Sequence, residues 1–212
     1  MIGDQLIIKP YHLPPARAIY SLVKSRLNAN KQVINISGES GSGKSTLAMA
    51  LRSVLEENGH QCFIFHMDDY FRLPPTSNHI QRLSDINYVG TQEVNLQLLQ
   101  DHVDAFLKGV ENLEKPLIHY RENEIRTELA DLKGVDILIT EGTYTSLLQN
   151  ILTKVFLTRD YKMSYEDRLK RGRDPIEPFI EDVLQIEHLI IKKHMDLADI
   201  LVDDEYNVKV NN

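Results

Sequence analysis

The sequence lacks several features that mark secreted, membrane-spanning and repeat proteins. Cys62 is the only cysteine among 212 residues, which excludes an internal disulfide and predicts a reducing compartment. It belongs to the apolar run 62–65, and we interpret it as a core residue. No hydrophobic run reaches the length of a membrane-spanning helix, and residues 1–15 contain no apolar segment typical of a signal peptide. These patterns predict a cytoplasmic protein without a membrane partner.

The chain also lacks the charge pattern of a nucleic-acid-binding protein. Its net charge is −7, and it has no basic tract with interleaved aromatic residues. His188 and His194 do not form a zinc-binding H-E-x-x-H motif. Hydrophobic residues make up 42% and charged residues 26%, which is typical of a globular domain with one sizeable core. The composition therefore argues against nucleic acid as a partner, but leaves room for one local basic pocket.

Residues 38–45 read Gly-Glu-Ser-Gly-Ser-Gly-Lys-Ser and match the phosphate-binding pattern G-x-x-x-x-G-K-[S/T]. The glycines let successive backbone N–H groups point into one concavity. Lys44 supplies a charge for the β- and γ-phosphates, and the Ser45 hydroxyl can bind Mg²⁺. The predicted nucleotide-binding residues are Gly38, Glu39, Ser40, Gly41, Ser42, Gly43, Lys44, Ser45 and Thr46.

The flanking segments favour this interpretation over an ordinary Gly/Ser turn. Residues 33–36 are apolar and largely β-branched, as in a buried strand. Leu47, Leu51 and Val54 then recur at helical spacing, and Gly59 is a candidate C-cap. A strand, a loop and a helix are the arrangement that the motif requires, because the helix N-terminus also attracts phosphate.

The rest of the chain alternates between strand and helix patterns. This predicts an α/β fold, a P-loop NTPase-type parallel sheet with helices on both faces. We expect an N-terminal arm over 1–30, with a short strand at 6–8 and a helix after Pro15, and a kinase-type domain over 31–212 with a small lid at about 159–174. Residues 121–128 are polar and predict a hairpin or an exposed loop. The other expected strands are 62–65, 116–118, 136–140, 154–157 and 200–202, and the expected helices include 96–107 and 179–190.

In such sheets, ligands collect beyond the carboxyl ends of the strands. The strand at 62–65 is followed by Asp68 and Asp69. We expect Asp68 to face the phosphate loop, where a carboxylate can accept the proton of an attacking hydroxyl or help to hold the water shell of a metal. The alternative is that both aspartates cap the following segment, and for Asp69 the two interpretations are balanced.

The strand at 137–140 ends in Glu141 and Gly142. An acid at the end of a core strand beside a phosphate loop occupies the Walker-B position. It would bind Mg²⁺ directly or through water, and Gly142 would permit a close approach of the backbone. The predicted metal-binding residues are thus Ser45, Glu141 and Asp68.

A run of basic residues follows the strand at 154–157. Kinases need cations that close over the triphosphate, and we expect Arg168, Arg171 and Arg173 to serve in a lid, although a solvated helix would show the same pattern. Weaker candidates for binding an acceptor are Tyr70, Tyr88, Tyr120 and Arg121, of which Arg121 fits a solvated salt bridge equally well.

Taken in order, the motifs resemble those of the uridine kinase and phosphoribulokinase family. They are Gly38–Ser45, Met67–Phe71, Glu141–Thr143, Arg168–Asp174 and Ala198–Ile200. The resemblance implies an ATP- and Mg²⁺-dependent kinase that phosphorylates a hydroxyl of a small molecule. It also implies Asp68 as the base, Ser45 and Glu141 near the metal, and the arginines in the lid. Residues 87–94 and 118–120 differ from the family's nucleoside-binding segments, so the acceptor stays open among nucleosides, other ribosides and sugars.

The leading hypothesis is therefore a kinase whose partners are a nucleoside triphosphate and a small-molecule acceptor, either as a monomer or as a homo-oligomer. The second hypothesis is a non-kinase switch or degenerate regulator that only binds a nucleoside triphosphate. A base at Asp68 favours the kinase, because a switch needs no acceptor base.

Overall fold

A six-stranded sheet forms the centre of the computed structural model, which describes residues 8–28, 30–166, 168 and 177–211. The strand order is β2-β5-β1-β6-β7-β8, and every neighbouring pair is parallel except β7 and β8. The strands are β1 (Gln32–Gly38), β2 (Cys62–His66), β5 (Ile137–Gly142), β6 (Thr153–Leu157), β7 (Ile200–Val202) and β8 (Val208–Val210). The predicted parallel sheet is confirmed, with one antiparallel strand added at its edge.

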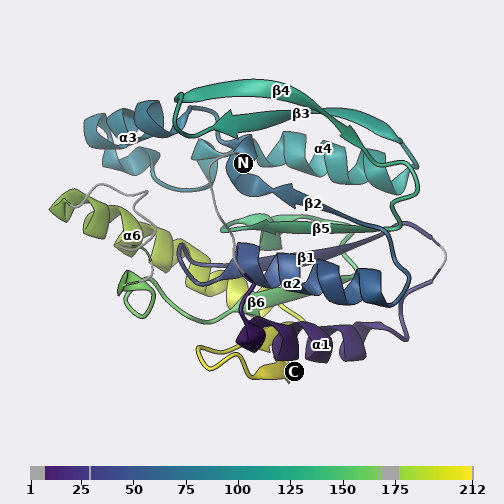
Figure 1. The fold of residues 1–212 in the computed structure, drawn as a ribbon. Coiled ribbons are helices and arrows are strands. Elements are labelled where there is room, and N and C mark those ends of the chain that lie inside the picture. The colour runs from purple at the N-terminus through teal and green to yellow at the C-terminus, as the bar shows by residue number, and fades with distance from the viewer. Residues whose placement is uncertain (1–7, 29, 167, 169–176, 212) are drawn as a thin grey trace.

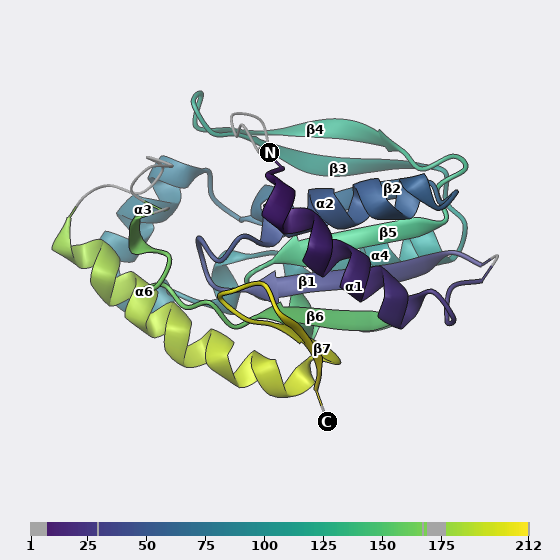
Figure 2. The same ribbon diagram turned by 60° about the horizontal axis from the view of Figure 1, so that its bottom comes forward.

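Helices cover both faces of this sheet, as Figures 1 and 2 show. On one face, α1 (Leu13–Val23) and α2 (Lys44–Glu57) pack on side chains such as Ile34 and Ile139. On the other face, α4 (Leu96–Leu107) packs on side chains such as Val33. β1 and β5 are buried along almost their whole length, because alternate side chains enter these two cores.

The N-terminal helix α1 is part of the first core. Ala16, Ile19 and Val23 are fully buried against α2, while Leu22 lies on the exposed side. The short 3₁₀ helix η1 (Pro10–His12) precedes α1. The strand expected at 6–8 falls almost entirely outside the described residues.

A separate antiparallel hairpin lies over α4 (Figure 1). Its strands are β3 (Asn112–His119) and β4 (Glu124–Asp131), paired in register from Asn112–Asp131 to His119–Glu124. The strand expected at 116–118 thus belongs to this second sheet, and the polar segment 121–128 forms the turn and the first half of β4. Leu113 and Ala130 face the core shared with α4, so one face of the hairpin is buried and the other is polar.

Several short elements follow the carboxyl ends of the strands. Helix α3 (Pro75–Ser84) and helix α6 (Pro178–Ile191) lie at the same end of the molecule, on the left in Figures 1 and 2. The 3₁₀ helices are η2 (Met67–Tyr70), η3 (Ile86–Tyr88), η4 (Thr91–Glu93), η5 (Thr145–Leu147) and η6 (Lys192–Leu197). This end of the sheet is where an α/β fold collects its ligands.

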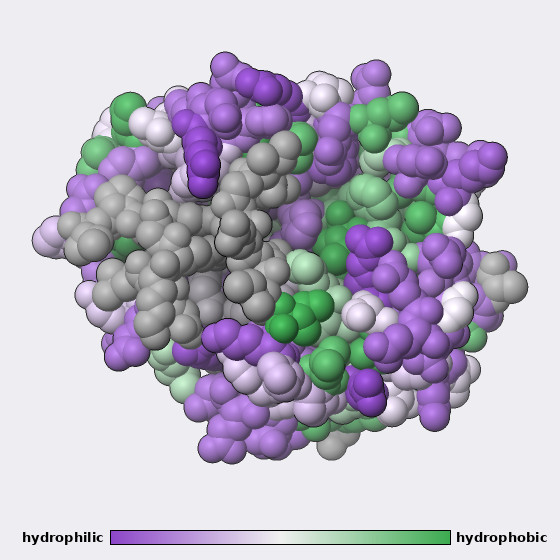
Figure 3. Space-filling model, viewed as in Figure 1, coloured by the Kyte–Doolittle hydropathy of each residue, from purple (hydrophilic) through white to green (hydrophobic). Residues whose placement is uncertain are grey.

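The face drawn in Figure 3 is largely hydrophilic, and its apolar side chains form small groups. Within the described ranges, no helix is both long and apolar enough to cross a membrane.

Candidate active site

The phosphate loop joins β1 to α2 in a conformation that depends on glycine. Gly41 and Gly43 have φ angles of +77° and +101°, which side chains with a Cβ atom rarely adopt. Gly43 is the N-cap of α2, so the free N–H groups of the first helical turn point toward the loop. Residues 39–43, with the start of α2, therefore form the concave, positively polarised site that the sequence predicts.

Lys44 lies at the first position of α2 and is largely buried. Its Nζ donates a hydrogen bond to the main-chain oxygen of Glu39, 2.7 Å away. The ammonium group thus folds back across the loop, and this brings a positive charge to the place where phosphates would enter.

Ser45, Glu141 and His66 form a cluster beside the loop. Ser45 Oγ donates to Glu141 Oε1 over 3.1 Å, and His66 Nδ1 lies 2.6 Å from the same oxygen. Burial alone would raise the pKa of Glu141, but the bonds and charges of His66, Lys44 and Ser45 outweigh it and lower that pKa. Glu141 is therefore a carboxylate at neutral pH. Burial likewise works against a charged His66, but its bond to Glu141 raises the His66 pKa.

The donors of this cluster suit magnesium. A hydroxyl and an ionised carboxylate are hard oxygen ligands, and Mg²⁺ is usually held by one or two carboxylates together with substrate phosphates. Gly142 extends β5 where a Cβ atom would lie 2.3 Å from Met67 Cβ, so only glycine lets this strand end approach η2. Over the described ranges, no group of three or more His, Cys, Asp or Glu side chains forms a metal site of its own.

The two aspartates after β2 point in different directions. Asp68 lines a cavity of about 330 Å³, whereas Asp69 is fully buried under the hairpin. Asp69 Oδ2 lies 3.2 Å from Lys115 Nζ, and Asp69 Oδ1 accepts a hydrogen bond from the N–H of Ile118 over 3.1 Å. Lys115 also pairs with Glu128, 2.6 Å away. Asp69 therefore anchors β3 to η2, which holds the backbone of its neighbour Asp68.

Replacing Lys115 with alanine is expected to lower the free energy of unfolding by about 3–5 kcal/mol, because Asp69 would keep a buried charge without its cation. Urea unfolding followed by circular dichroism measures the change. The matched control is Lys133→Ala, because Lys133 is exposed in the turn after β4. Equal stability of the Lys115 variant and the wild type would contradict an anchoring role for this pair.

The cavity that Asp68 lines has a volume of about 330 Å³ and opens between the phosphate loop, the hairpin, α3 and α6. Ser40 and Asp68 face it together, so the loop and the predicted base share one space. The other lining residues are Phe71, Leu73, Pro75, Thr76, Asn78, His79, Arg82, Ile118, Tyr120, Thr143, Arg168, Ile180, Val183, Leu184 and Glu187. A cavity of this size can hold one small organic molecule.

The first part of the predicted lid lies directly on the phosphate loop. Ser164 Oγ donates to the carbonyl oxygen of Ser40 over 3.0 Å. Arg168 lines the cavity, and its Nη2 donates to the carbonyl oxygen of Tyr161 over 3.3 Å. Arg171 and Arg173 lie outside the described residues, so their place in a lid stays a prediction.

The side chain of Glu39 connects the first residues of the predicted lid to α6. One of its carboxylate oxygens accepts a hydrogen bond from the N–H of Tyr161 over 2.8 Å, and the other lies 2.6 Å from His188 Nδ1. The side chain of Glu39 therefore links three segments, while its backbone remains part of the loop. His188 lies 149 positions away from Glu39 in the chain, so the motif match gives no sign of this contact.

Replacing Gly41 with alanine is expected to weaken ATP binding by about tenfold or more, equivalent to about 1.4 kcal/mol or more. A Cβ atom there would lie 2.5 Å from Arg168 Cγ and 2.9 Å from Ser164 Oγ, so either the loop or the predicted lid must move. Calorimetric titration with ATP measures the effect. Gly59→Ala is the control, because Gly59 also has a positive φ but no atom within 4 Å of the added Cβ. Equal ATP affinities of the two variants would show that the close packing of Gly41 against Ser164 and Arg168 does not determine the conformation of the loop.

The four weaker acceptor candidates separate in the structure. Tyr120 lines the cavity. Tyr70 does not: its ring is buried in the core beside α4, and its hydroxyl pairs with His102 Nδ1 at 2.9 Å. Tyr88 lies in η3, and Arg121 is exposed in the hairpin turn, and neither lines the cavity. The structure therefore corrects the expectation for Tyr70, whose hydrophobic neighbours and hydroxyl partner make it a core residue.

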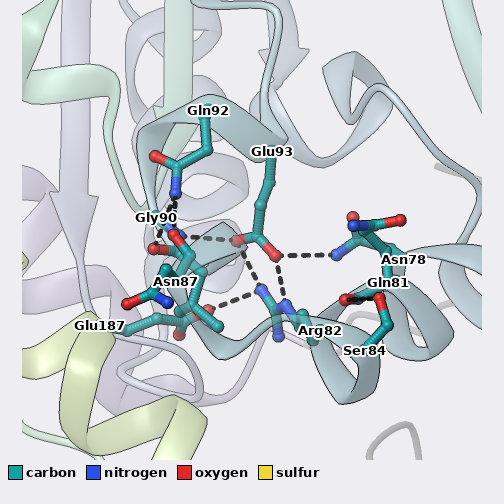
Figure 4. A network of polar contacts seen from close by, with 10 residues as sticks. Asn78, Gln81, Arg82, Ser84, Asn87, Gly90, Gln92, Glu93 and Glu187 are labelled. Carbon is teal, nitrogen blue, oxygen red and sulfur yellow. Dashed lines mark hydrogen bonds and ion pairs between the residues drawn. The ribbon is translucent and has the colours of Figure 1, made fainter.

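The sequence gives no sign of a polar network that joins α3, η4 and α6 in the structure. Arg82 forms an ion pair with both oxygens of the fully buried Glu93, and its Nη2 also lies 2.9 Å from Glu187 Oε1. Asn78 Nδ2 and the N–H of Gly90 donate to Glu93 as well, each over 3.1 Å (Figure 4). The three charged residues are far apart in the chain, so no local motif relates them.

Comparison with known proteins supports the resemblance to the uridine kinase and phosphoribulokinase family. The family model described as "Phosphoribulokinase / Uridine kinase family" matches residues 33–210. The bifunctional alpha-galactosidase/sucrose kinase of Mediterraneibacter gnavus is 28% identical over 193 residues, which are 84% of this chain but only 21% of that longer protein. The uridine kinase of Clostridium novyi is 26% identical over 84% of this chain and 89% of its own length.

Solved structures agree with the fold. A possible uridine kinase from Bacillus stearothermophilus superposes with a TM-score of 0.63 at 20% identity, over 89% of this chain and 97% of that one. The relatives indicate a kinase with a nucleotide and a small molecule as its substrates. With the phosphate loop, the acid after β5 and the family match in agreement, this chain belongs to the phosphoribulokinase/uridine kinase family.

Proposed function

We propose that this protein is a kinase that transfers the γ-phosphoryl group of ATP to a hydroxyl of a nucleoside, a related riboside or a sugar. The observation that carries the proposal is that Asp68 and the phosphate loop residue Ser40 face the same 330 Å³ cavity. Phosphoryl transfer needs a donor and an acceptor to meet in line, and catalysis then depends mostly on positioning and charge.

The donor half of the reaction rests on the phosphate loop. Its backbone N–H groups and the α2 N-terminus would bind the phosphates, and Lys44 would neutralise the γ-phosphoryl oxygens. Ser45 and Glu141 would hold Mg²⁺, which supplies further positive charge at the phosphates when bound. Arg168 lines the cavity, and we assign it, together with Arg171 and Arg173, to closing over the same group.

The acceptor half rests on Asp68. Its carboxylate would orient the acceptor hydroxyl and take its proton as the new bond to phosphorus forms. The Lys115–Asp69 pair fixes the adjacent backbone, which limits how far this carboxylate can stray from the productive geometry. The named activities of the relatives, sucrose kinase and uridine kinase, favour sugar or ribose hydroxyls as acceptors.

A coupled assay of ADP release with Mg²⁺ and ATP tests this function. Nucleosides, other ribosides, neutral sugars and sugar acids are added one at a time, and the phosphorylated product is identified by mass spectrometry. We expect at least one acceptor to stimulate ADP release in proportion to product. Nucleotide binding without acceptor-stimulated turnover across the set would instead favour a nucleotide-dependent switch.

A further inference from the structure

His66 is the last residue of β2, and the sheet places it directly beside Glu141. The two residues are register partners in the parallel pair of β2 and β5. Side chains alternate between the two faces of a strand, so His66 shares a face with Ile64, and Glu141 shares it with Ile139. Both isoleucines pack in the core under α2. The imidazole and the carboxylate therefore extend from neighbouring strands on the side of the sheet that α2 covers.

The other strand neighbour of Glu141 is apolar. Its register partner on β1 is Ile36, which is fully buried and offers no hydrogen bond to a carboxylate. His66 is thus the polar one of the two strand neighbours, and its Nδ1 lies 2.6 Å from Glu141 Oε1. The Glu141 side chain is only 4% exposed, so bulk water cannot easily replace this bond.

The contact fixes the place of a hydrogen on the His66 ring. An ionised carboxylate accepts hydrogen bonds and donates none, so Nδ1 must carry hydrogen. The charged imidazole and one of its neutral tautomers both meet this condition. His66 is therefore a donor to Glu141 whichever charge the ring carries.

Two donors of this cluster reach the same oxygen of Glu141. Ser45 Oγ donates to Oε1 over 3.1 Å from the start of α2, and His66 Nδ1 reaches Oε1 from β2. Glu141 Oε2 takes neither of these bonds. The last torsion of a glutamate side chain is broad, so a free carboxylate would rotate. Two donors on Oε1 restrict that rotation and so determine the direction in which Oε2 points.

We propose that His66 is a positioning residue that holds Oε1 of Glu141, so that Oε2 is presented to the Mg²⁺ ion of the bound nucleotide. Ser45 is itself a predicted ligand of this ion, and His66 supplies the anchor that is not a ligand. Hydrogen-bond partners of metal ligands typically contribute about 10–100-fold to metal affinity or activity. The inference rests on the proposed function and adds to its metal site a residue outside the phosphate-loop motif.

The test measures binding and does not depend on turnover. Calorimetry gives the affinity for a non-hydrolysable ATP analogue in excess Mg²⁺ and again in EDTA. The ratio of the two affinities, which we call the magnesium factor, equals by linkage the factor by which the protein tightens Mg²⁺ binding to the nucleotide. We expect His66→Leu, which removes the donor, to lower the magnesium factor by about tenfold or more and to leave the affinity in EDTA unchanged.

Two further variants show whether the donor itself matters. The amide nitrogen of His66→Asn is as many bonds from Cα as Nδ1 is, so it can donate to Glu141 from the same place. We expect His66→Asn to restore most of the magnesium factor. His66→Ala adds no bulk and should show the same loss as His66→Leu, so that the result does not depend on how leucine packs.

The matched control is His60→Leu. His60 Nδ1 lies 2.6 Å from Asp136 Oδ2, just before β2 and β5 begin, so the same kind of bond joins the same two strands at their opposite end. His60→Leu should keep the wild-type magnesium factor. Thermal melting of all variants reports any loss of stability that the two histidine contacts have in common.

The outcomes separate this inference from the proposed function. An unchanged or higher magnesium factor in His66→Leu and His66→Ala would overturn the inference, and so would equal losses of affinity in Mg²⁺ and in EDTA. An asparagine variant that behaves like the leucine variant, or a wild type whose affinity Mg²⁺ does not raise, would overturn it too. In each of these cases, acceptor-stimulated ADP release by the wild type would leave the kinase assignment standing. A magnesium factor that depends on His66, without turnover, would support the inference and count against the kinase.

Discussion

Replacing Lys44 with alanine is expected to lower the rate of ADP formation by about 10³-fold or more. The charge of Lys44 acts in a site from which water is partly excluded, and losing one such preorganised group typically costs about 10²–10³-fold in rate. Because Lys44 also bonds to the backbone of Glu39, its removal would loosen the loop as well. Initial rates with saturating acceptor measure the effect, and calorimetry reports any loss of ATP affinity.

The control for this variant is Lys108→Ala, because Lys108 is exposed just after α4. It should keep the wild-type rate. Turnover within about tenfold of wild type in Lys44→Ala would mean that Lys44 does not stabilise the transferred group, since a lost oxyanion donor costs more than this.

Replacing Asp68 with asparagine is expected to lower phosphoryl transfer by about 10²–10⁴-fold, which is the usual contribution of a general base. Asparagine has nearly the same shape but cannot take a proton. Asp68 faces the cavity and does not belong to the phosphate loop, so the affinity for ATP should change little. Rapid-quench measurement of a single turnover isolates the chemical step, and a separate titration measures nucleotide binding.

Asp101→Asn is a suitable comparison, since this aspartate is exposed on α4. Full activity of the Asp68 variant would remove Asp68 from the role of base. A variant that loses ATP affinity and activity together would instead place Asp68 in the binding of the metal and the phosphates.

Local patterns were sufficient to predict the strand, the glycine-dependent loop and the helix start that form one side of the candidate site. β1, the loop and the start of α2 are contiguous, so this local structure follows from spacing alone, whereas phosphate binding by residues 38–46 stays a prediction. Glu141 was accessible for a related reason, because the strand before it is a continuous apolar run that ends in a single acid. Parallel strands bring their carboxyl ends to one edge, and so two separate segments meet without any knowledge of the side-chain contacts.

The polar network between α3, η4 and α6 could not be predicted from local patterns. Arg82, Glu93 and Glu187 come together only because α3, η4 and α6 meet in three dimensions, and each looks like an ordinary surface charge in its own segment. Tyr70 and Tyr120 are both tyrosines near the predicted site, but only contacts with α4 show that the first belongs to the core. Adjacent aspartates pose the same difficulty, since nothing local tells which of Asp68 and Asp69 turns under the hairpin.

Helix α6 contacts both the phosphate loop and helix α3 through two adjacent residues. His188 contacts Glu39 of the phosphate loop, and Glu187 contacts Arg82 of α3, which lines the cavity. A small rotation of this helix would change both contacts at once. We therefore expect the two substrates of the proposed kinase to bind synergistically: a bound acceptor should raise the affinity for ATP, and thermodynamic linkage requires ATP to raise the affinity for the acceptor by the same factor.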